Sequence, residues 1–269
     1  MPNHLFNYTL HLADNSLIMG HRLSEWTGHG PMLEQDIAIS NIALDLIGQS
    51  RNFYQYAAKL INSISETERS KVLSFGEDFG EVTEDSLAYL RDAREFKNIL
   101  LAELPNGDWA KTILKLFFFS TYQYFLYQNL INSSDKQLAA IAEKSLKEVT
   151  YHLRWSSEWV IRLGDGTEES NRRIKLALEE IWPFTGEMFE AAGYENLCTE
   201  EQAGVAVSEL KNDWQNKVKD VLEEASLSYP AEEKIWMQTG GKNGMHTEHL
   251  GFILAEMQFL QRAYPGCEW

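Results

Sequence analysis

The apolar residues of this chain recur at helical spacing over long stretches. Between residues 39 and 60, Ile, Leu, Phe and Ala side chains recur at spacings of three, four and seven, and residues 139–163 repeat the pattern. Such a stripe is typical of a helix that buries one face against a core. No run with the alternating period of a β-strand interrupts these stretches. The pattern therefore predicts an all-helical chain.

Glycine, proline and acidic residues divide the pattern into segments. The predicted helices cover residues 5–27, 33–64, 84–104, 108–132, 135–163, 168–191, 207–227 and 244–264, with an irregular stretch at 65–82. Two capping boxes, Ser134 to Gln137 and Thr199 to Gln202, are expected to open helices. Pro183 falls inside a helical pattern, so we expect it to kink or end that helix.

The lengths of these segments favour one architecture. Long helices with short links pack antiparallel, and a bundle with one long crossover is the ferritin-like arrangement. Here the connection between the second and third long helices is much longer than the others. We predict an all-α, ferritin-like four-helix bundle at about residues 5–163, with additional C-terminal helices at about 168–264. Residues 1–269 would form a single domain.

A bundle of this kind raises the question of a di-iron site. Such a site takes a carboxylate from each of two helices and a Glu-x-x-His pair from each of the other two, because residues three apart share a helix face. No Asp or Glu in this chain is followed three residues later by His, and residues 109–134 contain no Asp, Glu or His. We therefore expect this chain to bind no metal.

The expected ligand positions are degenerate in two helices. Asp45 is followed three residues later by Gly48, and Glu148 by Tyr151, with His152 one place too far. Buried carboxylates need a partner or stay protonated. We expect Asp45, Glu148 and His152 to form a hydrogen-bonded cluster where a metal would lie.

Glu25 of the first predicted helix is a further candidate for that cluster. The alternative is that these four polar residues are ordinary surface or helix-pair residues.

A second group of possible ligands lies near the C-terminus. His246, Glu248 and His249 follow a glycine-rich stretch at 239–244. Histidines three apart share a helix face and could bind a metal, but zinc proteases space theirs by four and no third ligand is near. The other interpretation is a capped helix start after a tight turn that the glycines allow.

Basic residues recur in one segment, as Arg91, Arg94 and Lys97. On a helix they could face one way and bind a phosphate of coenzyme A or of a nucleotide. Asp92 and Glu95 are interleaved with them, so the alternative is a salt-bridged helix face.

The charge of the chain excludes some partners. The formal net charge is −16, from 40 acidic and 24 basic residues. Such a field repels nucleic acid and anionic membranes, so we expect neither as a partner. Cys198 and Cys267 form no disulfide pattern, which favours a reducing compartment. No targeting segment or apolar run of about 18 residues is present. We expect a cytoplasmic protein.

Several stretches resemble the PaaC family, whose members belong to the phenylacetyl-CoA epoxidase complex. They are residues 23–26, 41–49, 51–53, 105–107, 151–154, 239–242, 246–251 and 254–258. The likeness extends from the first helix to Trp269, and residues 65–82 are its least typical part. The resemblance implies a bacterial cytoplasmic complex that epoxidises the ring of phenylacetyl-CoA.

The resemblance also implies a division of labour. The catalytic subunit of that family is a di-iron paralogue, PaaA, and a reductase supplies electrons from NADPH. PaaC is its non-catalytic structural partner, so the resemblance implies no cofactor on this chain. It further implies that Glu95, Phe96, Lys97 and Asn98 approach the CoA substrate, which the partner mainly holds. The alternative is an independent ferritin-like enzyme with a non-standard metal site.

That alternative site would be built from Glu148, His152 and the pair His246 and His249. The sequence leaves both interpretations open.

Overall fold

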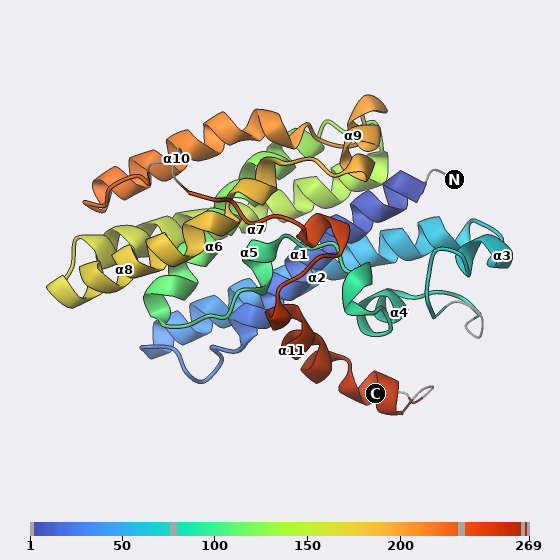
Figure 1. Cartoon of the computed structure of the whole chain (residues 1–269), viewed down its shortest axis with the longest axis horizontal. Coiled ribbons are helices and arrows are strands. Elements are labelled where there is room, and N and C mark those ends of the chain that lie inside the picture. The colour runs from blue at the N-terminus through green and yellow to red at the C-terminus, as the bar shows by residue number, and fades with distance from the viewer. Residues whose placement is uncertain (1–2, 76–79, 231–234, 265–266, 268–269) are drawn as a thin grey trace.

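The computed structural model describes residues 3–75, 80–230, 235–264 and 267. Within these ranges every regular element is an α-helix or a 3-10 helix (Figure 1). This confirms the all-α prediction. Among the described residues, none of the helices has the length and apolar character needed to cross a membrane.

Four long helices form the bundle. They are α1 (Asn3–Ser24), α2 (Leu33–Asn62), α6 (Trp109–Leu130) and α7 (Lys136–Gly164). Short links join α1 to α2 and α6 to α7, and each pair packs along its length. A long crossover at residues 63–108 joins the two pairs. The ferritin-like arrangement expected from the sequence is therefore the one observed.

The remaining elements surround this bundle. The crossover contains α3 (Glu66–Arg69), α4 (Glu84–Tyr89), η1 (Ala93–Glu95) and α5 (Leu100–Glu103). The C-terminal part contains α8 (Glu168–Ile181), η2 (Trp182–Phe184), η3 (Gly186–Phe189), α9 (Gly193–Glu200), η4 (Val207–Leu210), α10 (Lys211–Glu224), η6 (Gly241–Asn243), α11 (Glu248–Met257) and α12 (Phe259–Ala263). In Figure 1, α8 and α10 lie beside α6 and α7, whereas α11 projects from the opposite side.

Aromatic residues hold the C-terminal helices against α6. Phe118 of α6 is fully buried, with ring centroids 5.6 Å from Trp182 and 5.5 Å from Trp214. The indole nitrogen of Trp214 donates to the backbone oxygen of Phe118 at 3.0 Å. Large aromatic side chains contribute much of the burial energy of a core. The bundle and the C-terminal helices therefore share one core.

Helix ends follow local chemistry, with two departures from the sequence prediction. Asp135, not Ser134, caps α7, because its carboxylate accepts from the amides of Gln137 and Leu138. The box starting at Thr199 opens no helix, because α9 ends there at Glu200. The prediction for Pro183 is confirmed, since α8 stops at Ile181 and gives way to 3-10 turns.

The predicted helix at 84–104 is wrong, and its failure is informative. Only three short helical pieces form there, and residues 96–99 are extended or irregular. Two backbone amides that a helix would use internally instead donate to α1. Lys97 N donates to Asp14 at 2.8 Å, and Ile99 N donates to Asn15 at 2.8 Å. We call residues 91–104 the strap, because they lie across α1 and are held there by its side chains.

Candidate functional site

Two hydrogen-bonded contacts join α2 and α7 at the level predicted for a degenerate metal site. His152 Nε2 donates to Asp45 Oδ2 at 2.9 Å, and Gln49 Nε2 donates to Glu148 Oε2 at 3.0 Å. The His152 ring is buried, but 38% of the Asp45 side chain is exposed. Asp45 and His152 thus bond to each other, whereas Glu148 bonds to Gln49, so the three residues make two separate contacts.

Three other predicted positions lie elsewhere. Glu25 accepts from Arg22 Nη1 at 2.7 Å and from Asn106 Nδ2 at 3.0 Å, beyond the end of α1. The expectation that Glu25 joins the cluster is wrong, because these two donors hold it at the start of the link to α2. Gly48 and Tyr151 are both exposed on the outside of their helices. Neither position points toward the interior of the bundle.

Amides and hydroxyls occupy the interior of the bundle at this level. Gln123 Nε2 of α6 lies 3.3 Å from Ser16 Oγ of α1 and 3.3 Å from the Tyr127 hydroxyl. Burial raises the pKa of Tyr127, and the nearby charge of Glu148 raises it further. An iron pair requires several carboxylates and imidazoles facing one another. Among the described residues, no group of three His, Cys, Asp or Glu side chains is placed to hold a metal, so a di-iron centre does not fit here.

The densest polar contacts lie instead between the strap and its neighbours. Asp14 of α1 is fully buried and receives Arg91 Nη1 at 3.1 Å, Lys97 N at 2.8 Å and the Tyr54 hydroxyl. Burial lowers the pKa of Arg91, but the charge and hydrogen bond of Asp14, together with Tyr54 and Glu95, outweigh this and raise it overall. A buried ion pair of this kind needs every partner, because either charge left alone is costly.

His11 and Asn15 hold the next part of the strap. Asn15 Oδ1 accepts from Ile99 N, and His11 Nδ1 donates to the Lys97 carbonyl oxygen at 2.7 Å. Asn15 Nδ2 donates to His11 Nε2 at 3.2 Å. Burial lowers the pKa of His11, which favours the neutral ring that this arrangement requires. One ring nitrogen donates and the other accepts.

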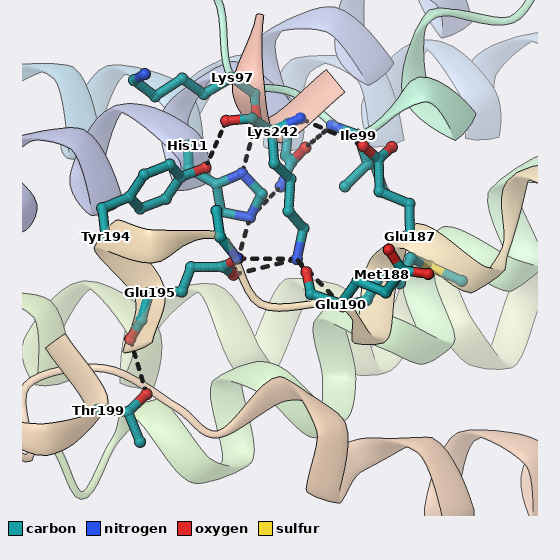
Figure 2. Close-up of polar contacts among 12 residues, drawn as sticks. His11, Lys97, Ile99, Glu187, Met188, Glu190, Tyr194, Glu195, Thr199 and Lys242 are labelled. Atoms are coloured by element: carbon teal, nitrogen blue, oxygen red, sulfur yellow. Dashed lines mark hydrogen bonds and ion pairs between the residues drawn. The ribbon is translucent and has the colours of Figure 1, made fainter. Parts of the chain in front are cut away.

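The buried side chain of Lys242 connects residues 240–247, here called the C-terminal loop, to the region around His11 (Figure 2). Lys242 Nζ lies 3.0 Å from Glu195 Oε2 and 2.9 Å from the Glu190 carbonyl oxygen. Glu195 Oε1 lies 3.6 Å from His11 Nε2. The side chains of Lys242 and Glu195 are both buried, so their charges are screened little by water.

Glu187 links the strap and the C-terminal loop through backbone amides. Its carboxylate accepts from Leu100 N at 2.7 Å, from Gly240 N at 2.8 Å and from Lys242 N at 3.3 Å. Burial raises the pKa of Glu187, while the three amides act in the opposite direction. One side chain thus satisfies donors from two segments far apart in the sequence.

Glu103 also connects the strap to the C-terminal loop. It accepts from Thr247 N at 2.6 Å, from Asn98 Nδ2 at 2.9 Å and from His246 Nδ1 at 2.9 Å. His246 Nε2 lies 3.0 Å from the Phe96 carbonyl oxygen. Because both partners of His246 are acceptors, the ring must carry a proton on each nitrogen to bond to both. Burial lowers the pKa of His246, but the hydrogen bond and charge of Glu103, together with the Phe96 carbonyl oxygen and Asp14, outweigh it and the net shift is upward.

The group at residues 246–249 is a capped helix start. Thr247 caps α11 and its hydroxyl accepts from His249 N at 3.3 Å. Gly240 and Gly244 have φ of +136° and +77°, which favour glycine. A Cβ on Gly241 would lie 2.3 Å from the Asn98 carbonyl oxygen, so the turn also packs directly on the strap.

The basic residues of the strap do not share one face. Arg91 is buried in its pair with Asp14, Arg94 is exposed, and Lys97 is half-buried with Nζ 5.4 Å from the centroid of the Tyr194 ring. The prediction of a single basic helix face is wrong, because this segment is not a continuous helix.

The four substrate-contact candidates also differ in accessibility. The side chains of Phe96 and Asn98 are buried, and the Glu95 carboxylate accepts from Asp92 N and from Ser74 Oγ. Lys97 is half-buried and reaches the surface. Contact of these four residues with a CoA substrate stays a prediction, and Lys97 is the one whose charged side chain reaches the surface.

Sequence reasoning missed most of the residues that hold the strap and the C-terminal loop beside it, namely His11, Asp14, Asn15, Glu187, Glu195 and Lys242. One signal was available for three of them. His11, Asp14 and Asn15 are spaced as i, i+3 and i+4, so they share one face of a helix that is otherwise largely apolar. Polar residues on a buried face must find partners.

The sequence is similar to known proteins over its whole length. The family model described as phenylacetic acid catabolic protein, PaaA_PaaC, matches residues 1–269. The chain belongs to this family. Within the PaaA_PaaC family, it is 45% identical over 267 residues to one subunit, designated C, of the 1,2-phenylacetyl-CoA epoxidase of Escherichia coli (strain K12). That match covers 99% of this chain and 100% of the relative. The resemblance inferred from short stretches is confirmed over the whole length.

Proposed function

We propose that this chain is the non-catalytic, structural subunit of a phenylacetyl-CoA epoxidase complex. A PaaA-type paralogue would carry the di-iron centre, and a reductase would bring electrons from NADPH. The similarity to the epoxidase subunit of Escherichia coli over 99% of the chain is the observation that carries this proposal. The cysteine usage supports a cytoplasmic complex, as expected for a reducing compartment.

The contacts of the bundle support a structural role. The interior at the level of Gln123 is built from amides and hydroxyls, and Glu148 is engaged by Gln49. The buried carboxylates of Asp14 and Glu187 accept from backbone amides of the strap, at Lys97 and Leu100 respectively. A frame fastened in this way suits a subunit that holds the helices of a partner in place.

The independent metalloenzyme gains no support from the geometry. His152 bonds to Asp45 on the outer side of the bundle, whereas His246 lies between Glu103 and the Phe96 carbonyl oxygen. These histidines belong to different clusters. A metal site built from both would require one of the clusters to be taken apart.

The proposal is tested by reconstitution. The chain and a PaaA-type subunit are produced separately and together, and iron is measured in each preparation. We expect a stoichiometric complex, with iron in the PaaA-type subunit and with epoxidation of phenylacetyl-CoA by the complex given reductase and NADPH. If the chain alone bound stoichiometric iron and epoxidised the substrate, the proposal would be wrong.

The proposed substrate contact has its own test. In the reconstituted complex, Lys97→Gln is expected to raise KM for phenylacetyl-CoA severalfold with little change in kcat, because the residue would bind phosphate rather than take part in oxidation. Lys175→Gln, on the exposed side of α8, is the matched control. An unchanged KM for Lys97→Gln would remove the residue from the substrate site.

A further inference from the structure

The outward face of α2 presents large apolar side chains to water. Leu33, Ile37 and Leu44 are all exposed, and Leu44 has 68% of its surface accessible. Gly48 continues this face, and a Cβ added there would meet no atom within 4 Å. Residues 37, 41, 44 and 48 are spaced by four, three and four. This is the spacing of a helix that packs along a second helix, and an open glycine allows a close approach.

The adjacent helix extends this surface. The Asp45–His152 bond places α2 and α7 side by side at this level. Leu44 and Tyr151 each immediately precede one of the bonded residues. In antiparallel neighbours, a step of one residue back turns both side chains toward the same outer side. Tyr151 is 40% exposed there. We call Ile37, Asn41, Leu44, Gly48 and Tyr151 the outer α2–α7 surface.

The α7 side of this surface has a basic rim, although the chain as a whole is acidic. Lys144, Lys147 and Arg154 are exposed there, whereas Arg51 on the α2 side is paired with Glu84 at 3.4 Å and Asp45 is partly exposed. Glu158, farther along α7, is paired with Arg162. With a net charge of −16 on each chain and like charges on facing rims, two copies would repel. A partner surface with an apolar centre and an acidic rim would be complementary to the outer α2–α7 surface.

We propose that the outer α2–α7 surface docks a helix of the PaaA-type subunit, which presents apolar residues within an acidic rim. This inference rests on the proposed function, since it names the face through which that partner binds. The helical spacing of residues 37, 41, 44 and 48 specifies a helical occupant, and Gly48 sets how closely that helix approaches α2. Asn41 lies within the seam, where a polar residue favours one register of packing over others.

Surface variants test the inference in the full-length chain. Leu44→Glu is expected to weaken binding to the PaaA-type subunit by about 100-fold, because it buries a charge at the centre of the contact. Leu176→Glu, at another exposed leucine on α8, is the control and should bind as the wild type does. Affinity is measured by titration calorimetry, and folding by circular dichroism.

A second variant separates docking from folding. Gly48→Gln should stabilise the free chain, because glycine is a poor helix former, but it should weaken docking by about tenfold through lost close approach. If the wild type binds and both surface variants bind equally well, the docking face is wrong and the proposed function stands.

Two other results would also be decisive. If the wild type fails to bind any PaaA-type subunit, the proposed function fails and the docking face fails with it. If light scattering shows a dimer of the chain alone and Leu44→Glu dissociates it, the occupant is a second copy, and the inference about the partner is overturned.

Discussion

The polar contacts between α2 and α7 differ from those around the strap in their burial and in the number of donors that each carboxylate satisfies. Between α2 and α7, each contact is a single bond at a partly exposed site, as between Asp45 and His152. Around the strap, the carboxylates of Asp14, Glu103 and Glu187 are buried, and each satisfies several donors. The stability of a buried polar group depends on the completeness of its bonds. The polar contacts between α2 and α7 therefore contribute little to stability, whereas those of the strap contribute much.

The largest effect is expected at the buried ion pair. Asp14→Ala leaves Arg91 charged and unpaired in the core, which should cost about 3–5 kcal/mol of unfolding free energy. Urea unfolding followed by circular dichroism measures the loss. The double variant Asp14→Leu with Arg91→Met should recover much of it, because both charges are gone. A loss below about 1 kcal/mol for Asp14→Ala would show that the pair is not the main anchor.

The second largest loss of unfolding free energy is expected for a substitution of Glu187. Glu187→Ala removes the acceptor of buried amides at Leu100, Gly240 and Lys242, for an expected cost of about 2–3 kcal/mol. Hydrogen exchange at the Leu100 and Gly240 amides should accelerate. Glu187→Gln keeps one carbonyl oxygen and should lose less. Unchanged exchange at both amides would contradict the role of Glu187 as the link between the two segments.

The third effect depends on pH. The pKa of His246 is raised in the folded state, so its stabilisation is fully present below the unfolded pKa of about 6.5 and is lost as pH rises through the higher folded pKa. Glu103 is its main partner, and Asp14 also acts on it. We expect the wild type to lose about 1 kcal/mol more than His246→Gln between pH 6 and pH 9. Parallel urea titrations of the two proteins measure this, and equal slopes would refute it.

The smallest effect is expected between α2 and α7. Asp45→Asn should change the unfolding free energy by less than about 1 kcal/mol, because the carboxylate is partly exposed and an amide can still accept from His152. Asp14→Asn is the matched comparison in the strap. If Asp45→Asn destabilised the chain as much as Asp14→Asn, the contrast between the two regions would disappear.

The sequence predicted the bundle well because its signals are local. Residues 33–64 and 135–163 were predicted as helices, and α2 and α7 cover Leu33–Asn62 and Lys136–Gly164. The strap was missed for the opposite reason. The segmentation of the chain predicted one helix at 84–104, but Arg91 bonds to a carboxylate 77 residues away. No local pattern records a partner at that distance.

The candidate site was predicted in part for the same reason. Asp45 and His152 were recognised because motif spacing pointed to them, and they do meet. Glu25 was misplaced, because its helix position could not reveal that Arg22 and Asn106 would bind it. The alternative of a capped helix start at Thr247 was readable from the sequence, since caps are local. The hydrogen bond from Thr247 N to Glu103 could not be read from the sequence, because the two residues are 144 positions apart.

The bonds between the strap and residues 240–247 also constrain the order in which the chain can be completed during synthesis. The amides that Glu103 and Glu187 require belong to a loop close to the C-terminus. Domains generally fold from the N-terminus as the ribosome releases the chain, and distant contacts form late. The four bundle helices emerge first and can pair, but the strap cannot be locked until residues 240–247 have emerged. A ribosome that stalls before this loop would therefore release a bundle whose crossover is still open to proteases.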